Sequence, residues 1–364
     1  MRPGRARFYR LRKFMGFRMT DKAKTKKRVW LNQWFSTAYH IVNLLREDDD
    51  FDFYIIGTSR NMHSPVRLVC DEWYEEPEYK DSEVYLSFCV DFCQAHDIDI
   101  FIPRRGMGIV AHNLARFKNT KIMVEHDVRL FDICNDKLSC YEYIKPFLPE
   151  IIPEYALVKN AEDFEKSCAE MSARYDAVCY KASRDEGATT YRKFNKHICD
   201  ALGSIPRARG IYIAALFGEA YAKMSSDSVL LVMPHLNGLE VSVDVLRTGS
   251  GLILLPRYKP GGRYEYITYE PDIIALCQTI ISHIPLDMPF NIQFKYHDGK
   301  PYLLEINTRM SGGVQLAVLA SGVNIPNIAC NKLLGIEKEW HVNTRGTGLT
   351  YIETPLIVRD DYDI

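Results

Sequence analysis

Strands and helices are predicted to alternate over the first third of the chain, because short apolar runs are separated by longer stretches with helical spacing. The predicted strands are 29–31, 53–59, 98–102 and 121–124, and the predicted helices between them are 35–46, 84–96 and 109–117. Strands and helices in this order form a doubly wound parallel sheet. Ligands bind at the carboxyl ends of such strands, so the loops 57–60 and 104–108 are candidates to hold part of a substrate.

Antiparallel strands are predicted further along the chain. An apolar run at 229–236 leads into a second run, in which valine alternates with polar residues at 241–245. A third apolar run at 252–255 gives way to a basic, glycine-bearing loop at 256–263, and a final strand is expected at 347–356. Two further runs, 290–296 and 301–306, flank a turn that contains Asp-Gly, which is typical of a β-hairpin.

The hairpin carries a set of oxygen-bearing side chains. Counting in steps of two places Gln293 on one face of its first strand, and Glu305 and Asn307 together on one face of the second. One carboxylate with amide oxygens beside it suits Mg²⁺, which leaves its other positions to phosphates and water. Arg309 adds a positive charge two residues later. A solvated hairpin edge explains any one of these residues, whereas the four together favour a metal–phosphate site.

The letters NIQF, a glycine-containing turn, LLEINTR and SGG resemble the metal-binding end of the ATP-grasp superfamily. Its carbamoyl-phosphate-synthetase-like and biotin-carboxylase-like branches are the most similar. The resemblance covers residues 29–335 and is strongest at 230–244 and 290–335. It implies an α/β chain, α+β in its core, in which an N-terminal domain with a doubly wound parallel sheet precedes an ATP-grasp fold. That fold consists of a lid subdomain and a C-terminal subdomain with an antiparallel sheet.

The expected division of the chain has four parts: a basic tail at 1–28, a Rossmann-like N-terminal domain at 29–125, a linker helix with the lid at 126–232, and the C-terminal subdomain with the metal site at 233–364. The tail holds twelve Lys or Arg against one acid. It is compatible with a nucleic-acid or membrane-surface arm, a transit peptide or a tail without a role, and Met15 and Met19 add a later translation start. We favour a disordered or artefactual tail.

By the same resemblance, the nucleotide-binding residues are Lys137, Lys181, Gly187, Thr189, Met233, Pro234, His235, Leu236, Glu240, Gln293 and Glu305. The Pro234 carbonyl would accept from the adenine amino group, the Leu236 N–H would donate to the ring, and Glu240 would hold the ribose hydroxyls. Two residues depart from the family pattern. Gly187 is the one glycine in the loop that covers the phosphates, where several are usual, and Met233 stands where an acid is common.

The resemblance implies an enzyme that uses ATP and Mg²⁺, with Mn²⁺ as a substitute, to phosphorylate a carboxylate. An amine or thiol then displaces phosphate from the acylphosphate, and ADP and phosphate are the products. The expected catalytic residues are Arg309, Lys181 and Arg257, and the expected metal ligands are Gln293, Glu305 and Asn307. A solvated surface loop is an equal alternative for the neighbouring cations Lys259 and Arg263.

Two alternatives remain open. One is a carboxyphosphate- or carbamoyl-phosphate-type enzyme that uses bicarbonate, although the chain has no second homologous half and no glutaminase segment. The other is a catalytically weak, ATP-binding regulator, which the single glycine and Met233 suggest. We favour a ligase acting on an amino acid or another small carboxylate.

Composition adds few limits. The chain has 364 residues, a formal net charge of −1 and ten cysteines with no CxxC pair. We therefore expect reduced cysteines, a cytoplasmic location and no structural zinc. The charge makes no case for nucleic acid, and no apolar run has the length of a membrane span. The expected partners are small-molecule carboxylate and amine substrates, and a homodimer is left open.

Overall fold

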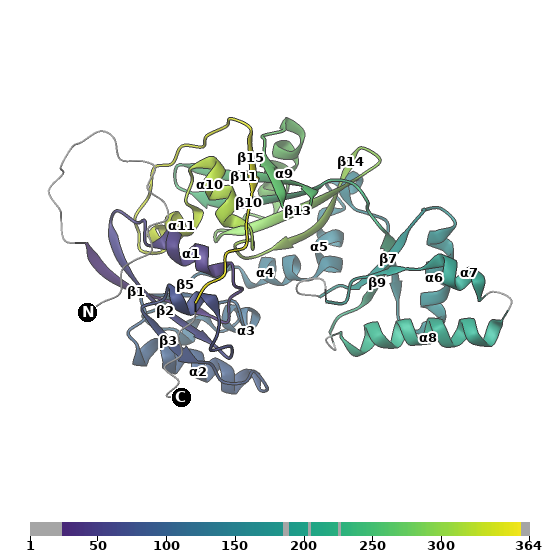
Figure 1. Cartoon of the computed structure of the whole chain (residues 1–364), viewed down its shortest axis with the longest axis horizontal. Coiled ribbons are helices and arrows are strands. Elements are labelled where there is room, and N and C mark those ends of the chain that lie inside the picture. Colours follow the sequence, from purple (N-terminus) through teal and green to yellow (C-terminus); the bar gives the residue numbers. More distant parts are fainter. Residues whose placement is uncertain (1–23, 185–188, 203–204, 225–226, 358–364) are drawn as a thin grey trace.

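The N-terminal part of the computed structural model is a five-stranded parallel sheet (Figure 1). The structure describes residues 24–184, 189–202, 205–224 and 227–357. The sheet has the order β3 (Glu72–Glu75), β2 (Phe51–Ser59), β1 (Thr25–Asn32), β4 (Ile100–Ile102), β5 (Lys121–Ile122). Its helices are α1 (Ala38–Leu45), α2 (Ser82–Ala95) and α3 (Met107–Ala111), with single 3₁₀ turns η1 (Pro65–Leu68) and η2 (Leu114–Arg116). The predicted parallel sheet is confirmed.

The first strand begins earlier than predicted. Residues 25–28 pair with β2 and so belong to β1, although the sequence analysis assigned them to the tail. Lys27 lies 2.8 Å from Asp99, and Arg28 lies 3.3 Å from Glu72. These charged residues lack the apolar pattern of a buried strand, which explains why the boundary was placed too late. Residues 1–23, the rest of the predicted tail, lie outside the described residues.

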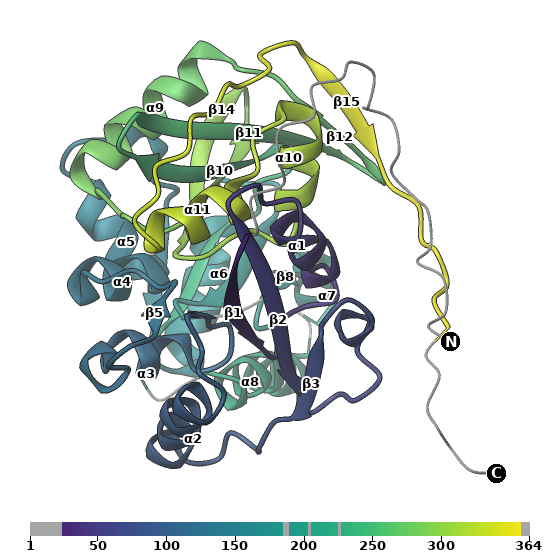
Figure 2. The same cartoon turned by 90° about the vertical axis from the view of Figure 1, so that its left-hand side faces the viewer.

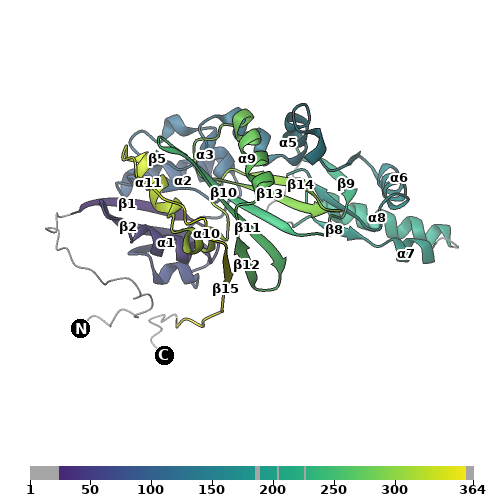
Figure 3. The same cartoon turned by 90° about the horizontal axis from the view of Figure 1, so that it is seen from above.

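Two short helices, α4 (Val128–Asn135) and α5 (Lys137–Ile144), and the turn η3 (Pro149–Ile151) lead to the lid. The lid sheet is antiparallel, with the order β6 (Ala156–Val158), β9 (Leu230–Pro234), β7 (Val178–Ala182), β8 (Arg192–Phe194). Its helices are α6 (Ala161–Ser172), α7 (Lys196–Ala201) and α8 (Pro206–Ala222). Figures 1 and 3 show that the lid projects from the rest of the molecule. It has its own apolar core around Phe164 and Tyr180.

The C-terminal part is built on a six-stranded antiparallel sheet. The order is β14 (Lys300–Asn307), β13 (Phe290–His297), β10 (Glu240–Thr248), β11 (Gly251–Gly261), β12 (Tyr264–Ile267), β15 (Thr347–Thr350). Its helices are α9 (Pro271–His283), α10 (Val314–Ser321) and α11 (Ile325–Leu333). The predicted final strand at 347–356 is shorter than expected, because pairing with β12 ends at Thr350. Among the described residues, no helix is both long and apolar enough to cross a bilayer.

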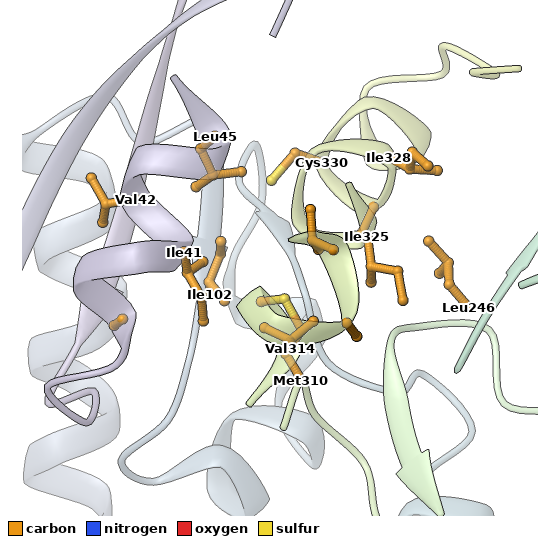
Figure 4. Close-up of a cluster of buried hydrophobic side chains, with 14 of the residues drawn as sticks. Ile41, Val42, Leu45, Ile102, Leu246, Met310, Val314, Ile325, Ile328 and Cys330 are labelled. Atoms are coloured by element: carbon orange, nitrogen blue, oxygen red, sulfur yellow. The ribbon is translucent and has the colours of Figure 1, made fainter. Parts of the chain in front are cut away.

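A shared apolar core joins the N-terminal and C-terminal parts. In β1, Val29 and Leu31 point into this core, whereas Trp30 points into a second core under α2 and α3. Helix α1 lies between the parallel sheet and helices α10 and α11 (Figure 2). Figure 4 shows the contact, with Ile41 and Leu45 of α1 on one side and residues of α10 and α11 on the other. The loops after β1 and β4 are therefore held next to the start of α10.

Candidate active site

One face of the antiparallel sheet is polar over several adjacent strands. Along β10, Val241, Val243 and Val245 are fully buried on one face, and the residues that alternate with them point to the other. These residues and their partners on β13 form three pairs: Glu240 with Lys295, Ser242 with Gln293, and Asp244 with Asn291. The predicted face of the hairpin thus extends onto β10, whose side chains sequence reasoning left out apart from Glu240. The period of two at 240–245 is the signal that could have included them.

A β-bulge sets which residues of β14 meet this face. Phe294 pairs with Leu303, but Gln293 pairs with Glu305, so Leu304 is an extra residue in β14. The bulge puts Glu305 opposite Gln293, and Asn307 then pairs with Asn291. Asn307 Nδ2 donates to Glu305 Oε1 over 3.0 Å. The structure therefore brings the three predicted metal ligands together.

Helix α5 supplies a lysine to the same group. Lys137 and Tyr141 are four residues apart and so share one face of α5. The Tyr141 hydroxyl donates to the carbonyl of Leu304 over 2.8 Å, and Lys137 Nζ lies 3.1 Å from Oε2 of Glu305. Burial alone would raise the pKa of Glu305, but Lys137, Asn307 and Lys181 outweigh it and hold this pKa below its ordinary value. The Glu305 carboxylate is therefore ionised and available to bind a metal cation.

The start of α5 is fixed to the lid. Asp136 caps the helix by accepting from the Ser139 N–H, and it also accepts from Ser183 Oγ and Arg184 Nε. The Lys137 N–H donates to the Ser183 carbonyl over 2.9 Å. Ser183 follows β7 directly, and the buried side chain of Lys181 lies near the end of that strand. These bonds therefore hold Lys181 close to Glu305, and its charge lowers the pKa of Glu305. The predicted lysine pair thus converges on the predicted metal ligands.

The predicted adenine-binding residues 233–236, called the hinge from here on, lie at the end of β9 and directly after it. Met233 is buried and pairs with Cys179, whose thiol donates to the Pro234 carbonyl over 3.5 Å. The His235 N–H donates to the Ala177 carbonyl, which extends the lid sheet by one residue. Leu236 is buried. A cavity of about 240 Å³ borders this hinge, lined in part by Pro234, Leu236, Tyr175, His297 and Tyr302.

Glu240, the predicted ribose ligand, lies next to the hinge on the polar face. Its carboxylate is 2.8 Å from Lys259 Nζ and 3.9 Å from Lys295 Nζ. Lys259 is therefore part of this face, not of a solvated surface loop, because β11 continues to Gly261. The prediction of a basic loop at 256–263 is wrong over most of its length, because these residues belong to β11 as far as Gly261.

Arg257 was also expected in that loop as a catalytic residue, and the structure places it elsewhere. Its side chain is 1% exposed, within β11. The guanidinium lies 3.2 Å from Asp244 and 2.5 Å from Glu265, and it donates to the hydroxyls of Ser242 and Ser311. Burial alone would lower the pKa of Arg257, but the two carboxylates outweigh it and raise this pKa. Arg257 is thus the centre of a buried ion-pair network.

The network of Arg257 reaches the predicted metal ligands through Asn291. This fully buried side chain donates to Asp244 Oδ1 over 3.1 Å and to Ser242 Oγ over 3.0 Å. Its oxygen accepts from Gln293 Nε2 over 3.1 Å. Because the nitrogen end of the Gln293 amide is held in this way, the oxygen end is directed elsewhere, as metal binding requires. Asn291 therefore joins the two groups of side chains, and sequence reasoning did not select it.

Three predicted residues remain. Gly187 lies outside the described residues. Thr189 is exposed just before β8, and its neighbour Thr190 accepts from the Ala182 N–H. Arg309 is half-buried between the hairpin and α10, and its guanidinium lies over the Phe35 ring at 5.6 Å.

The donor set fits Mg²⁺. One carboxylate and two amide oxygens are hard ligands, and Mg²⁺ is bound through one or two carboxylates together with phosphates and water. Among the described residues, no group of three or more His, Cys, Asp or Glu side chains is arranged to hold a metal ion. All ten cysteines are free thiols, and burial raises the pKa of Cys179 to about 11.

Comparisons with known proteins agree with this fold. Residues 226–355 match a family model described as ATP-grasp in the biosynthetic pathway with Ter operon. A comparison with curated proteins gives no match. Among solved structures, the biotin carboxylase domain of Hydrogenobacter thermophilus 2-oxoglutarate carboxylase has a TM-score of 0.65 at 16% identity, covering 87% of this chain and 72% of its own. That structure is a dimer in complex with MgADP, ADP and bicarbonate.

Two further structures show the same fold. N5-carboxyaminoimidazole synthetase from Staphylococcus aureus, complexed with ADP, has a TM-score of 0.65 at 13% identity, covering 91% of this chain and 83% of its own. The L-amino acid ligase from Bacillus licheniformis has a TM-score of 0.60 at 12% identity, with coverages of 85% and 75%. The resemblance stated from the hairpin motifs is confirmed: residues 226–355 match an ATP-grasp family model, and the chain shares the fold of these ATP-grasp structures.

Proposed function

We propose that the chain is an ADP-forming ligase, which uses ATP and Mg²⁺ to phosphorylate a small carboxylate and then lets an amine or thiol displace phosphate. The observation that supports it most is the Lys137–Glu305 ion pair beside the amides of Gln293 and Asn307. A carboxylate held ionised between a cation and amide oxygens is the arrangement that a metal–triphosphate complex needs.

Each residue of the site has a part in this reaction. Gln293, Glu305 and Asn307 would hold Mg²⁺, which neutralises charge on the β- and γ-phosphates when bound; Mn²⁺ suits the same oxygen ligands. Lys137 and Lys181 would bind the phosphates as point charges from rigid elements. The adenine would lie at the hinge and the ribose hydroxyls at Glu240.

The two chemical steps follow from this placement. A carboxylate oxygen of the substrate attacks the γ-phosphorus, the bond to the β-phosphate oxygen breaks, and ADP leaves. The amine nitrogen then attacks the acylphosphate carbonyl, phosphate leaves with the bonding electron pair, and the amine gives up its proton. Arg309 would stabilise the charge on the transferring group. Closure of the lid would exclude water, which would otherwise hydrolyse the acylphosphate.

A second candidate is a carboxyphosphate-forming enzyme that uses bicarbonate. The similarity to a biotin carboxylase domain that binds bicarbonate favours it, and the L-amino acid ligase favours the first candidate. The carbamoyl-phosphate-type reaction belongs to this second class.

The ten free thiols suit a reducing compartment such as the cytoplasm.

The experiment is ADP release from MgATP, screened against pooled amino acids, other small carboxylates and bicarbonate, each with and without an amine. Glu305→Gln is the inactive variant, and Glu170→Gln, at an exposed position on α6, is its matched control. Release that needs a carboxylate and an amine supports the ligase, and release on bicarbonate alone supports the second candidate. ATP binding without release in any pool would contradict both and favour a regulator. Wild-type rates in Glu305→Gln would remove the metal assignment; we expect a loss of at least about 100-fold.

A further inference from the structure

A hydrogen bond joins the start of β8 to the hinge. The Tyr191 hydroxyl lies 2.5 Å from Nδ1 of His235, the residue between Pro234 and Leu236. Both side chains are half-buried. In the lid sheet, β7 lies between β8 and β9, so the contact bridges β7. Tyr191 has no part in the metal and phosphate binding described above.

Only one protonation state of His235 permits this bond. Burial and the neighbouring Cys179 thiol raise the pKa of Tyr191, so its hydroxyl keeps the proton and donates. The acceptor is then Nδ1 of a neutral imidazole, whose own proton is on Nε2. A protonated imidazole carries hydrogen on both nitrogens and cannot accept. Protonation of His235 therefore breaks the contact with Tyr191.

The surroundings keep His235 neutral. Burial is the largest influence that lowers the pKa of His235, and Lys193 of β8 and Lys295 and His297 of β13 lower it further. The Cys179 thiol of β7 also keeps its proton, because burial raises its pKa to about 11. Since the pKa of His235 is below its ordinary value, the bond is present at neutral pH. It is lost only as the pH falls through that lowered pKa.

The bond completes the restraint of the hinge. The His235 N–H donates to the Ala177 carbonyl over 2.8 Å, which holds the main chain of the hinge. Tyr191 holds the side chain of the same residue. The Pro234 carbonyl and the Leu236 N–H, which are predicted to bind adenine, flank this doubly held residue. A site whose groups are oriented before the ligand arrives binds more tightly, because less freedom is lost on binding.

We propose that Tyr191 is a positioning residue for the nucleotide base, and that it acts through His235 to fix the hinge. Affinity for the base then depends on the neutral form of His235 and falls on acidification. This inference rests on the proposed function, because it concerns the nucleotide of the same site.

The test is binding of adenosine without Mg²⁺, measured by calorimetry from pH 8 to pH 4.5. Adenosine has no phosphate and needs no metal, so neither phosphate protonation nor the pKa of Glu305 enters the result. Tyr191→Phe removes only the hydroxyl. His235→Asn offers an amide oxygen in place of Nδ1 and does not titrate. Tyr221→Phe on α8 and His197→Asn on α7 are matched controls at exposed positions.

At pH 8, Tyr191→Phe should bind adenosine about fivefold more weakly than the wild type, as for the loss of one hydrogen bond. The wild type should lose the same factor as the pH falls, because protonated His235 no longer accepts. Tyr191→Phe should show no such loss, so that the two proteins have equal affinity at low pH. His235→Asn should keep most of the wild-type affinity at every pH. Both controls should follow the wild-type profile.

Four results would overturn the inference. They are wild-type affinity of Tyr191→Phe at pH 8, equal weakening of Tyr191→Phe at every pH, a loss in acid for His235→Asn as large as in the wild type, and no measurable binding of adenosine by the wild type. The second of these would show a merely structural role for Tyr191.

Failure of this inference is distinct from failure of the proposed function. Adenosine binding that depends on pH through Tyr191, without ADP release on any carboxylate, would support the positioning role and contradict the ligase. ADP release on a carboxylate and an amine, with adenosine affinity that ignores Tyr191, would do the opposite.

Discussion

Lys137 Nζ lies 3.1 Å from Oε2 of Glu305, and this ion pair connects the start of α5 to the bulged strand β14. The contact has two consequences. It keeps the Glu305 carboxylate ionised at the place where a metal ion would bind. It also holds the Lys137 ammonium group near the place where the nucleotide phosphates would bind. Both consequences can be tested separately, because one concerns the pKa of Glu305 and the other concerns nucleotide affinity.

Lys137→Met should move the acid limit of metal binding to higher pH. Partial burial of Glu305 opposes its ionisation, and Lys137 is the largest influence that lowers its pKa. The wild type should therefore lose Mn²⁺ only as the pH falls below the ordinary range of a glutamate, whereas the variant should lose it earlier. Mn²⁺ binding without nucleotide, followed by electron paramagnetic resonance across pH, measures this shift. Identical pH profiles would show that the ion pair does not control the carboxylate.

The same pair should affect stability with the same sign. Because its pKa is depressed in the folded state, Glu305 contributes stability above its unfolded-state pKa. This contribution is lost as the pH falls through the folded-state pKa. Denaturant unfolding of Lys137→Met should accordingly show a smaller loss of stability on acidification than the wild type.

Asn291→Ala should weaken metal binding without removing a metal ligand. The variant loses the acceptor that holds Gln293 Nε2 at 3.1 Å, so the Gln293 oxygen is no longer oriented. We expect the Mg²⁺ concentration for half-maximal activity to rise by about 10- to 100-fold, with kcat largely recovered at saturating Mg²⁺. A merely structural role would lower kcat at every Mg²⁺ concentration and leave the half-maximal concentration unchanged.

Arg257→Ala should be strongly destabilising. The guanidinium is buried between Asp244 and Glu265, so its removal leaves two carboxylates without their cation. Breaking a buried pair in this way costs about 3–5 kcal/mol in the free energy of unfolding. Arg263→Ala is the control, since its pair with Glu353 is exposed and is worth about 1 kcal/mol or less. Equal effects of the two changes on urea unfolding would contradict the assignment of Arg257 as a structural anchor.

The hairpin shows why part of the site was predictable. A period of two assigns residues to faces within one strand, and Gln293, Glu305 and Asn307 do lie together. How the strands pair was not predictable in this way. The carbonyl of the bulge residue Leu304 accepts from the Tyr141 hydroxyl of α5, and the bulge leaves no local signal in the sequence. Arg257 looked like part of a loop because Pro256, Lys259, Pro260 and two glycines surround it. Tertiary pairing of β11 with β10 overrides that composition.

Lys181→Met should weaken MgATP binding and leave the metal ligands intact. Lys181 is buried at the end of a rigid strand, so its charge is positioned before the nucleotide arrives and little entropy is lost on binding. We expect the dissociation constant for MgATP to rise by about tenfold or more, as for the loss of a charge-assisted hydrogen bond. Lys166→Met, at an exposed position on α6, is the matched control and should bind MgATP normally. Fluorescence titration with a nucleotide analogue measures both, and unaltered affinity in Lys181→Met would remove this lysine from the phosphate site. Free Mn²⁺ binding should meanwhile persist, because Lys137 still pairs with Glu305 in that variant.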